Sequence, residues 1–276
     1  MLQRHQRHSV TALEYALAIF TAIAKAIGLL LLLNTQRALH DLNQTNYGIG
    51  LFMIEIIIAT RLSENDFWDT SATALSLRRL EYDSRWVPRV AFENKQGLPD
   101  VYNARISAGV SDSTIIFMHD DVWIDDNFFF DRIIEGLQVY DVIGVVGNRR
   151  RIPLQPSWIF VDTNFTWDDR ANLSGVIAHG KDPFGPIDFF GSVPADCELM
   201  DGVLLAAKKE TLTANGLFFD PQFDFHFYDL DFCRSARQHG LRLGTWPISL
   251  THQSRGVANR GQWLQKYHSY IQKWGN

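Results

Sequence analysis

The stretch STIIFMHDD, residues 113–121, runs from an apolar segment into one histidine and two adjacent carboxylates. A short and almost continuously apolar run of this kind is typical of a strand that is buried on both faces of a parallel sheet. Adjacent carboxylates repel each other and raise each other's pKa, so the charge of Asp120 and Asp121 needs compensation. A divalent cation is the first candidate, because hard cations prefer carboxylate oxygen.

Similar apolar runs recur on both sides of this stretch and alternate with segments that suit helices. Strands are predicted at residues 51–60, 86–92, 113–119 and 141–147. Helices are predicted between them, at residues 63–80, from Pro99 to about Ala108, and at residues 126–140 with Asp126 or Asn127 as the cap. This alternation predicts an α/β domain with a parallel sheet.

The second half of the chain has a less regular order. Its predicted elements are a strand and a helix within residues 199–212, a helix from about Asp229 to His239 with Gly240 as C-cap, a strand ending at His252, and a helix at residues 259–274. Residues 149–198 carry prolines at positions 153, 156, 183, 186 and 194. We expect this region to be a loop-rich, mobile section that faces the substrate.

The composition is that of a soluble globular protein and excludes some partners. Of the 276 residues, 46% are apolar and 21% are charged. The net charge of −5 provides no basic surface for nucleic acid, so a phosphate ligand needs a metal ion or particular arginines. Cys197 and Cys233 lack metal-site spacing, and we interpret them as two reduced thiols of a cytosolic protein.

An apolar segment near the N-terminus, residues 13–33, is about as long as a bilayer crossing requires. Its polar interruptions share one stripe of a helix: Glu14, Thr21 and Lys25. We expect a helix that lies in a membrane interface or packs on a protein surface, with a membrane span as the second interpretation. No small-residue cleavage site follows it clearly, which argues against a secretory signal.

Polar residues follow three of the predicted strands at their carboxyl ends. They are Thr60-Arg61, Glu93-Asn94 and His119-Asp120-Asp121. Parallel sheets bind ligands beyond the carboxyl ends of their strands, so we expect these three stretches to meet in one crevice.

Acidic and imidazole groups at this crevice suggest metal chemistry. Asp120 and Asp121 suit a Mg²⁺ or Mn²⁺ ion that neutralises a departing nucleoside diphosphate, and an exposed acidic turn or helix cap is the alternative. Asp125 and Asp126 are assigned to that alternative, because a helix is predicted to begin there. His252 follows a predicted strand and is either a third ligand or a structural histidine.

A second acidic pair, Asp229 and Asp231, opens a predicted helix after a run of aromatic residues. Helix dipoles favour carboxylates at this position, so capping is one interpretation. The other is a general base, because a carboxylate without a basic neighbour can take a proton from an attacking hydroxyl.

The order of these pieces resembles one large enzyme family. An apolar strand ending in Thr-Arg is followed by ENKQGLPDVYNARI, IIFMHDDV, VIGVVG, MDGVLLAAKK, FDFHFYDLDFCRSARQHGLRL and SLTHQSRG. Over residues 51–256 this order resembles the inverting GT-A nucleotide-sugar glycosyltransferases of the family 2 type. The resemblance implies a Rossmann-like, mostly parallel sheet flanked by helices. It also implies one GT-A domain at residues 46–276, with a nucleotide-binding half at 46–148 and an acceptor-binding half at 149–276. The apolar pattern described above makes residues 1–45 an extra helical segment.

The resemblance implies roles for the residues that match the family's motifs. Asp121 matches the metal-binding acid of the Asp-x-Asp motif, and His252 matches the late histidine that reaches the metal or diphosphate. Asp229 matches the catalytic base of the Glu-Asp motif. The matching nucleotide-sugar-binding residues are Thr60, Arg61, Glu93, Asn94, Asn103, His119, Asp120, Asp201 and Gly202.

The sequence departs from the family's pattern at three sites. His119 stands where the first acid of the metal motif is usual, and Tyr228 stands where a glutamate usually precedes the base. Glu93-Asn94 stands where many relatives have an aspartate that reads the nucleobase, which leaves the nucleobase open.

The predicted activity is metal-dependent, inverting transfer of a sugar from a nucleoside-diphosphate sugar to an acceptor hydroxyl, with Mn²⁺ or Mg²⁺. We expect a surface glycan or lipid-linked acceptor, no nucleic-acid partner, and peripheral membrane contact through residues 13–33. The expected location is cytoplasmic, with the inner face of the membrane as a hypothesis. One alternative is a metal-dependent phosphohydrolase, but such enzymes place several histidines from helices around one site, and His179, His226 and His239 lack that arrangement. The other alternative is an inert nucleotide-sugar-binding module.

Overall fold

The computed structural model describes residues 53–108, 112–254 and 260–275. The chain divides after Leu51, and every described residue belongs to the unit Phe52–Asn276. The apolar segment at residues 13–33 and the predicted domain boundary after residue 45 lie outside the described residues and stay predictions. Across the described ranges, no helix has both the length and the apolar character needed to cross a bilayer.

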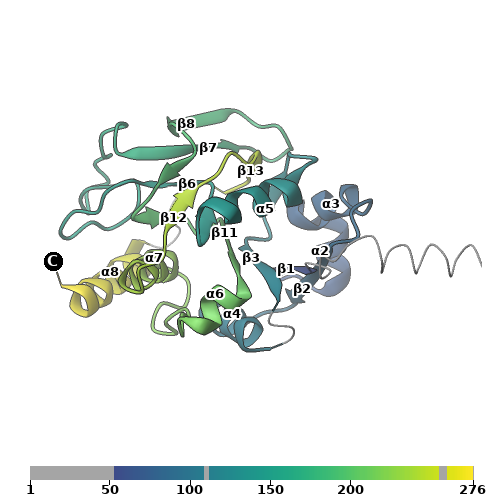
Figure 1. The fold of residues 1–276 in the computed structure, drawn as a ribbon, viewed down its shortest axis with the longest axis horizontal. Helices are drawn as coiled ribbons and strands as arrows, with labels where there is room; N and C mark the ends of the chain where they lie inside the picture. Colours follow the sequence, from purple (N-terminus) through teal and green to yellow (C-terminus); the bar gives the residue numbers. More distant parts are fainter. Residues whose placement is uncertain (1–52, 109–111, 255–259, 276) are drawn as a thin grey trace, which may run out of the picture. The chain divides into compact units, whose positions relative to one another are not determined.

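The larger of two sheets has seven strands in the order β2-β1-β3-β11-β5-β12-β9 (Figure 1). They are β1 (Met53–Ala59), β2 (Trp86–Ala91), β3 (Ser113–Met118), β5 (Val142–Gly144), β9 (Ala195–Asp196), β11 (Leu204–Lys208) and β12 (Leu243–Thr245). Only β11 and β9 run against the direction of the other strands. The predicted mostly parallel α/β sheet is therefore confirmed, and β2, β1 and β3 end at a common edge.

Apolar sequence explains why β1 and β3 occupy the middle of this sheet. Every residue of β3 is buried, as are the five residues from Ile54 to Ile58 in β1. Burial of each such isoleucine contributes about 1.5–3 kcal/mol. Glu55 is the charged exception within β1, and its carboxylate is paired with Arg89 at 3.0 Å and with Arg105 at 2.7 Å. This pairing makes a buried charge tolerable in a central strand.

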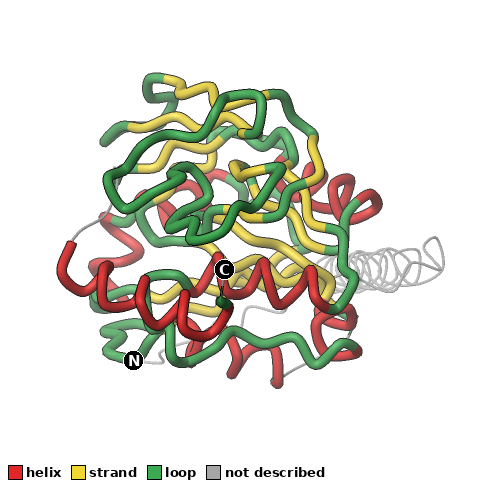
Figure 2. The backbone as a smooth tube through the Cα atoms, turned by 90° about the vertical axis from the view of Figure 1, so that its left-hand side faces the viewer, coloured by secondary structure: helices red, strands yellow, loops and turns green. Residues whose placement is uncertain are grey.

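Seven described helices pack around the strands. They are α2 (Glu64–Thr70), α3 (Ala72–Arg79), α4 (Leu98–Ser107), α5 (Phe129–Val139), α6 (Lys209–Ala214), α7 (Tyr228–Gln238) and α8 (Arg260–Trp274). The helices α4 and α6 contact each other and lie side by side at the bottom of Figure 1. Figure 2 shows α8 as the helix that leads to the C-terminus, and it buries Trp263 and Tyr270.

Two helix predictions are corrected by the structure. The single helix predicted at residues 63–80 is two helices, because Ser71 adopts an extended conformation and its side chain caps α3 by accepting a bond from the Ala74 N–H. The predicted cap of α5 is also wrong, since this helix begins after Phe128 and has no side-chain cap. Asp126 instead accepts a hydrogen bond from the Phe128 N–H at 2.8 Å.

A second sheet has the order β10-β6-β7-β13-β4, with β8 paired to β7. Its strands are β4 (Val122–Ile124), β6 (Val146–Asn148), β7 (Leu173–His179), β8 (Ile187–Gly191), β10 (Leu199–Met200) and β13 (Leu250–His252). The strand predicted at residues 141–147 is therefore divided between the two sheets. The prediction of a loop-rich region at residues 149–198 is wrong where β7 and β8 form. Their sequences mix serine, glycine and aspartate with apolar residues, which hides the strand pattern.

Candidate functional site

A cavity of about 730 Å³ lies between the carboxyl end of β3, the second sheet and the start of α7. The predicted site residues that line it are His119, Asp120, Asp121, Asp201, Gly202, Asp229 and His252. Much of the remaining wall is aromatic: Tyr102, Trp158, Phe160, Trp167, Phe190, Phe225, Phe227, Tyr228 and Trp263. The cavity thus combines a few polar groups with an apolar wall, as small-molecule sites do.

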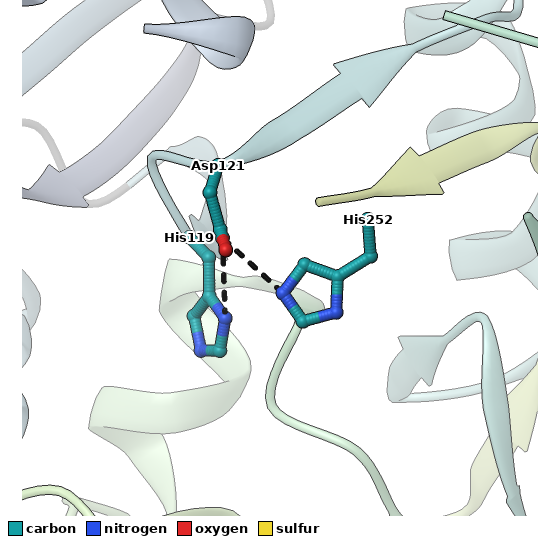
Figure 3. Close-up of side chains that lie close together, drawn as sticks. All are labelled: His119, Asp121 and His252. Atoms are coloured by element: carbon teal, nitrogen blue, oxygen red, sulfur yellow. Dashed lines mark ion pairs between the residues drawn. The ribbon is translucent and has the colours of Figure 1, made fainter. Parts of the chain in front are cut away.

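Three possible metal ligands meet at one side of the cavity. Figure 3 shows the Asp121 carboxylate between the imidazoles of His119 and His252. Asp121 Oδ1 lies 3.2 Å from His252 Nε2 and 3.9 Å from His119 Nδ1. One ligand atom from each side chain lies within 4.8 Å of the others. No other such group of three occurs at residues 53–108, 112–254 or 260–275.

Side-chain hydroxyls at the start of α3 hold the turn that follows β3. The Ser71 hydroxyl donates to the Asp120 carbonyl at 2.6 Å, and the Thr73 hydroxyl donates to the His119 carbonyl at 2.8 Å. On the other side, antiparallel pairing of β13 with β4 brings His252 to the same turn. The three ligands therefore come from segments that are anchored independently of any cation.

The charges of the three ligands depend on one another. Burial opposes ionisation of Asp121, but the hydrogen bond and charge of His252 hold the pKa of Asp121 well below its ordinary value. Burial also opposes protonation of His252, and Asp121 outweighs it and raises the pKa of His252. The pKa of His119 is lowered by burial and by the charge of His252, which favours a neutral imidazole. A divalent cation would take the place of the His252 proton, because metal ligands must be deprotonated.

A chain of hydrogen bonds runs from these ligands to Asp229. His119 Nε2 lies 3.0 Å from the Tyr228 hydroxyl, which donates to the Gly202 carbonyl at 3.0 Å. The Gly202 N–H in turn donates to Asp229 Oδ2 at 3.0 Å. A Cβ atom at Gly202 would lie 2.1 Å from the Tyr228 oxygen, so only glycine fits there. Tyr228 and Asp229 thus bind the backbone of one residue, Gly202, and His119 contacts Tyr228.

The first turn of α7 aims Asp229 at the cavity. Phe227 precedes the helix in the left-handed conformation, with a φ of 69°, and this turn fixes where α7 starts. Burial, followed by the charge of Asp201, raises the pKa of Asp229 to about 7. Asp231 lies elsewhere and pairs with Lys273 of α8 at 2.7 Å. Of the two acids weighed from the sequence, Asp229 is the one that lines the cavity.

Asp201 is held by a tryptophan that the sequence analysis missed. Trp158 Nε1 donates to Asp201 Oδ2 at 2.6 Å, and the Val203 N–H donates to Asp201 Oδ1 at 2.8 Å. Trp158 belongs to the region predicted as loop, and no sequence motif distinguishes it from the other aromatic residues there. Tyr228 was noticed only as a departure from the family's pattern, although it directly precedes Asp229.

The predicted nucleotide-binding residues outside the cavity lining are Thr60, Arg61, Glu93, Asn94 and Asn103. Their backbones tie the ends of β1 and β2 together, since the Thr60 N–H donates to the Ala91 carbonyl at 3.0 Å and the Asn94 N–H donates to the Thr60 carbonyl at 2.8 Å. Asn103 exchanges two bonds with the backbone of Phe219, at 2.7 and 2.9 Å. The structure brings the first four to one sheet edge, and the amide of Asn103 holds the loop at Phe219.

Asp125 has a different role from the helix start predicted for it. Its carboxylate accepts hydrogen bonds from the Phe184 N–H at 3.1 Å and from the Thr251 hydroxyl at 2.5 Å. It therefore connects the loop before β8 to β13, the strand that carries His252. The assignment of Asp125 to a helix start is wrong, because its partners are distant in sequence.

Comparisons with known proteins find that the chain is similar to several solved structures. The chain is similar to GalNAc-T7 with UDP, GalNAc and Mn²⁺, at 13% identity and a TM-score of 0.49, over 83% of this chain and 49% of that one. It is similar to the mannosyltransferase PcManGT from Pyrobaculum calidifontis in complex with GDP-Man and Mn²⁺, at 14% identity and a TM-score of 0.41, over 81% and 65% of the two chains. It is also similar to the catalytic domain of Drosophila beta1,4galactosyltransferase 7 in complex with xylobiose, at 10% identity and a TM-score of 0.39, over 76% and 78%.

The chain spans about half the length of the GalNAc-T7 chain. No protein-family model matches it, and no curated protein matches it in sequence. At sequence identities of 10–14%, this similarity is one of fold and does not extend to activity.

Proposed function

We propose that this chain is a metal-dependent glycosyltransferase that moves a sugar from a nucleoside-diphosphate sugar to an acceptor hydroxyl. One observation carries the proposal: a set of metal ligands and a carboxylate with a pKa of about 7 face the same cavity. Sugar transfer needs both features, because charge develops on the leaving diphosphate while a proton leaves the attacking hydroxyl.

The ligand set fits a divalent cation, because two imidazole nitrogens and one carboxylate oxygen converge within 4.8 Å. His119, Asp121 and His252 would hold the cation, and the cation would supply positive charge to the diphosphate. We propose Mn²⁺ rather than Mg²⁺, because imidazole suits transition metals and Mg²⁺ prefers oxygen ligands. Asp120, at the same turn, would face the donor sugar or ribose.

Asp229 is the proposed general base. A group with a pKa near the working pH is available in its basic form and still accepts a proton readily. Asp201 is the nearby acid, and both of its oxygens already accept hydrogen bonds from Trp158 and Val203. In one displacement the acceptor O–H proton passes to Asp229, the new C–O bond forms at the anomeric carbon, and the nucleoside diphosphate leaves with the electron pair. Attack from the opposite face inverts the anomeric centre.

The likeness to family 2 glycosyltransferases suggests where the two substrates bind. The nucleotide would lie over the ends of β1 and β2, at Thr60, Arg61, Glu93 and Asn94, in the half at residues 46–148. The acceptor would lie against the aromatic wall contributed by residues 149–276, beside Asp201 and Gly202. A surface glycan or lipid-linked acceptor is proposed, at a membrane reached through residues 13–33.

A panel of nucleotide sugars with Mn²⁺ tests the proposal. We expect one donor, among UDP-, GDP- and other nucleoside-diphosphate sugars, to raise the melting temperature of the wild-type chain and to release nucleoside diphosphate when an acceptor is added. Asp229→Asn should keep the donor-induced shift and lower transfer by about 10²–10⁴-fold, as loss of a general base does.

Three outcomes would contradict the proposal in different ways. No stabilisation by any donor would count against nucleotide-sugar binding. Stabilisation without turnover by the wild-type chain would indicate an inert binding module. Phosphate release from donors without an acceptor would favour a phosphohydrolase, and unchanged transfer by Asp229→Asn would remove this residue from the mechanism.

A further inference from the structure

The Tyr228 hydroxyl lies between a proposed metal ligand and the loop that holds the proposed base. Its oxygen is 3.0 Å from His119 Nε2 and 3.0 Å from the Gly202 carbonyl oxygen. The side chain is 4% exposed, and its ring packs against Tyr102 and Phe219. Because Tyr228 is buried, bulk water cannot easily replace its hydroxyl beside His119.

The chemistry of these three groups fixes the direction of both hydrogen bonds. A carbonyl oxygen only accepts, so the single hydroxyl hydrogen of Tyr228 is donated to Gly202. The contact with His119 is then satisfied only if the imidazole donates its Nε2–H to the Tyr228 oxygen. A neutral imidazole has one N–H, so Nδ1 of His119 carries a free lone pair. Nδ1 is the atom that faces Asp121, at 3.9 Å.

We propose that Tyr228 is a positioning residue that holds His119 in the Nε2–H tautomer and so presents Nδ1 to a divalent cation. The inference rests on the proposed function for the presence of that cation. Metal-binding histidines generally donate their second ring N–H to a fixed acceptor, and loss of that acceptor weakens metal binding about 10–100-fold. Tyr228 provides this acceptor through a side chain that the Gly202 peptide holds in place.

This role also connects two of the departures from the family's pattern, His119 and Tyr228. A carboxylate at position 119 would have no ring N–H to donate, so it would not need a hydroxyl acceptor at position 228. A histidine at position 119 does need one, because either ring nitrogen can carry the proton in water. His119 and Tyr228 therefore form a matched pair, although 109 positions separate them in the sequence.

Binding of Mn²⁺ to the full-length Tyr228→Phe variant tests the inference. Free Mn²⁺ is measured by electron paramagnetic resonance during a titration, and we expect the dissociation constant to rise about 10–100-fold relative to wild type. Tyr270→Phe is the matched control, because Tyr270 is 1% exposed and lies outside the cavity lining. The control should bind Mn²⁺ as the wild type does, and far-ultraviolet circular dichroism checks the folding of both variants.

The tautomer itself is measured by long-range ¹H–¹⁵N correlation spectra of the metal-free wild-type chain, labelled at histidine. We expect the Nε2–H form at His119, and the Nδ1–H form would overturn the inference whether or not the variant folds. In the His119→Asp background, Tyr228→Phe should cause no further loss of Mn²⁺ affinity. An equal loss in both backgrounds would show that Tyr228 does not act through His119.

The same measurements separate this inference from the proposed function. Normal sugar transfer with unchanged Mn²⁺ affinity in Tyr228→Phe would overturn the inference and leave the function standing. Tight Mn²⁺ binding that depends on Tyr228, without transfer of any sugar, would leave the inference standing and remove the function. Absence of Mn²⁺ binding by the wild-type chain would overturn both.

Discussion

Asp229 owes its proposed reactivity to its surroundings. The Leu230 and Gly202 N–H groups donate to its two oxygens and favour the charged form, yet burial and the neighbouring Asp201 outweigh them. The result is a carboxyl group whose pKa is raised to about 7. A surface aspartate would be fully ionised at that pH and would be a much weaker base.

The raised pKa predicts how transfer depends on pH. Only the deprotonated form of Asp229 can accept a proton, so kcat/KM should fall about tenfold per unit as pH drops below 7 and should level off above it. The measurement is a rate profile from pH 5 to 9 at saturating Mn²⁺, with Mn²⁺ affinity followed in parallel. A flat profile between pH 5 and 7 would contradict the role of Asp229.

The same shift predicts how stability depends on pH. The native carboxyl binds its proton more tightly than the unfolded one, whose pKa is near the ordinary 3.8, so its contribution to stability is present below about pH 4 and is lost as pH rises through about 7. Asp229→Asn should therefore gain stability relative to wild type at pH 8, and gain less at pH 5. Urea unfolding of the metal-free proteins at both pH values measures the difference, and a gain independent of pH would contradict the pKa.

A third prediction concerns the space around Gly202. An alanine there would bring Cβ to 2.1 Å from the Tyr228 oxygen and 3.0 Å from Asp229 Cβ, so the Tyr228 ring must shift. Overpacking of this kind destabilises a buried site by about 1–3 kcal/mol. We expect Gly202→Ala to lower the urea midpoint and to weaken Mn²⁺ binding. Gly216→Ala is no steric control, because its φ of 59° strains any side chain; Gly180→Ala is suitable, since its nearest neighbour would be 3.5 Å away.

Among the elements, α3 matters most for the site, because it holds the turn after β3. Ser71 has two roles in one hydroxyl: it accepts from the Ala74 N–H as the helix cap and donates to the Asp120 carbonyl. The break between α2 and α3 therefore helps to position the candidate site. It ends one helix so that the next can begin beside the acidic turn.

A cap comparison tests this arrangement. Ser71→Ala should lower the free energy of unfolding by about 1–2 kcal/mol, through loss of the cap and of the bond to Asp120. Ser63→Ala is the matched control, since the Ser63 hydroxyl caps α2 and its hydrogen bonds are to Asp66. Both variants should lose stability in urea unfolding, but only Ser71→Ala should also weaken Mn²⁺ binding. Equal Mn²⁺ affinities in the two variants would show that the Ser71 cap does not position the metal site.

At the scale of the whole molecule, the elements that could be predicted are those that a local sequence pattern encodes. The apolar runs of β1 and β3 are almost continuous, so their burial and the polar groups at their ends were predictable. The second sheet was only partly predictable: a strand ending at His252 was predicted, whereas β4 has only three residues and β7 and β8 mix polar with apolar residues. Pairing between distant segments determines those strands.

The candidate site shows the same division. Asp121, His252 and Asp229 were predicted from strand ends and from the family resemblance, and the structure brings them to one cavity. Asp125 was misassigned because its partner Thr251 is 126 positions away, while an acid before a helix gives the same local signal as a cap. The contact of Tyr228 with His119 was unpredictable for the same reason.

The proposed cation ligands come from both sheets, so binding of a cation would depend on how the two sheets are held together. His119 and Asp121 follow β3 of the first sheet, and His252 ends β13 of the second. A cation that binds only the folded state would stabilise it by about 2.7 kcal/mol at 100 times its dissociation constant. Mn²⁺ should therefore raise the melting temperature of the full-length chain, and Mg²⁺ at the same concentration should raise it less, because two of the ligands are imidazoles.

His252→Ala should abolish the Mn²⁺-dependent shift in melting temperature, because it removes the ligand that the second sheet contributes. His239→Ala is the matched control: this exposed histidine ends α7 and bonds to Ser235, away from the cavity lining. It should keep the full shift. A Mn²⁺ shift that survives in His252→Ala would place the ion elsewhere on the molecule. A larger shift with Mg²⁺ than with Mn²⁺ would indicate that oxygen ligands, and not the two imidazoles, bind the cation.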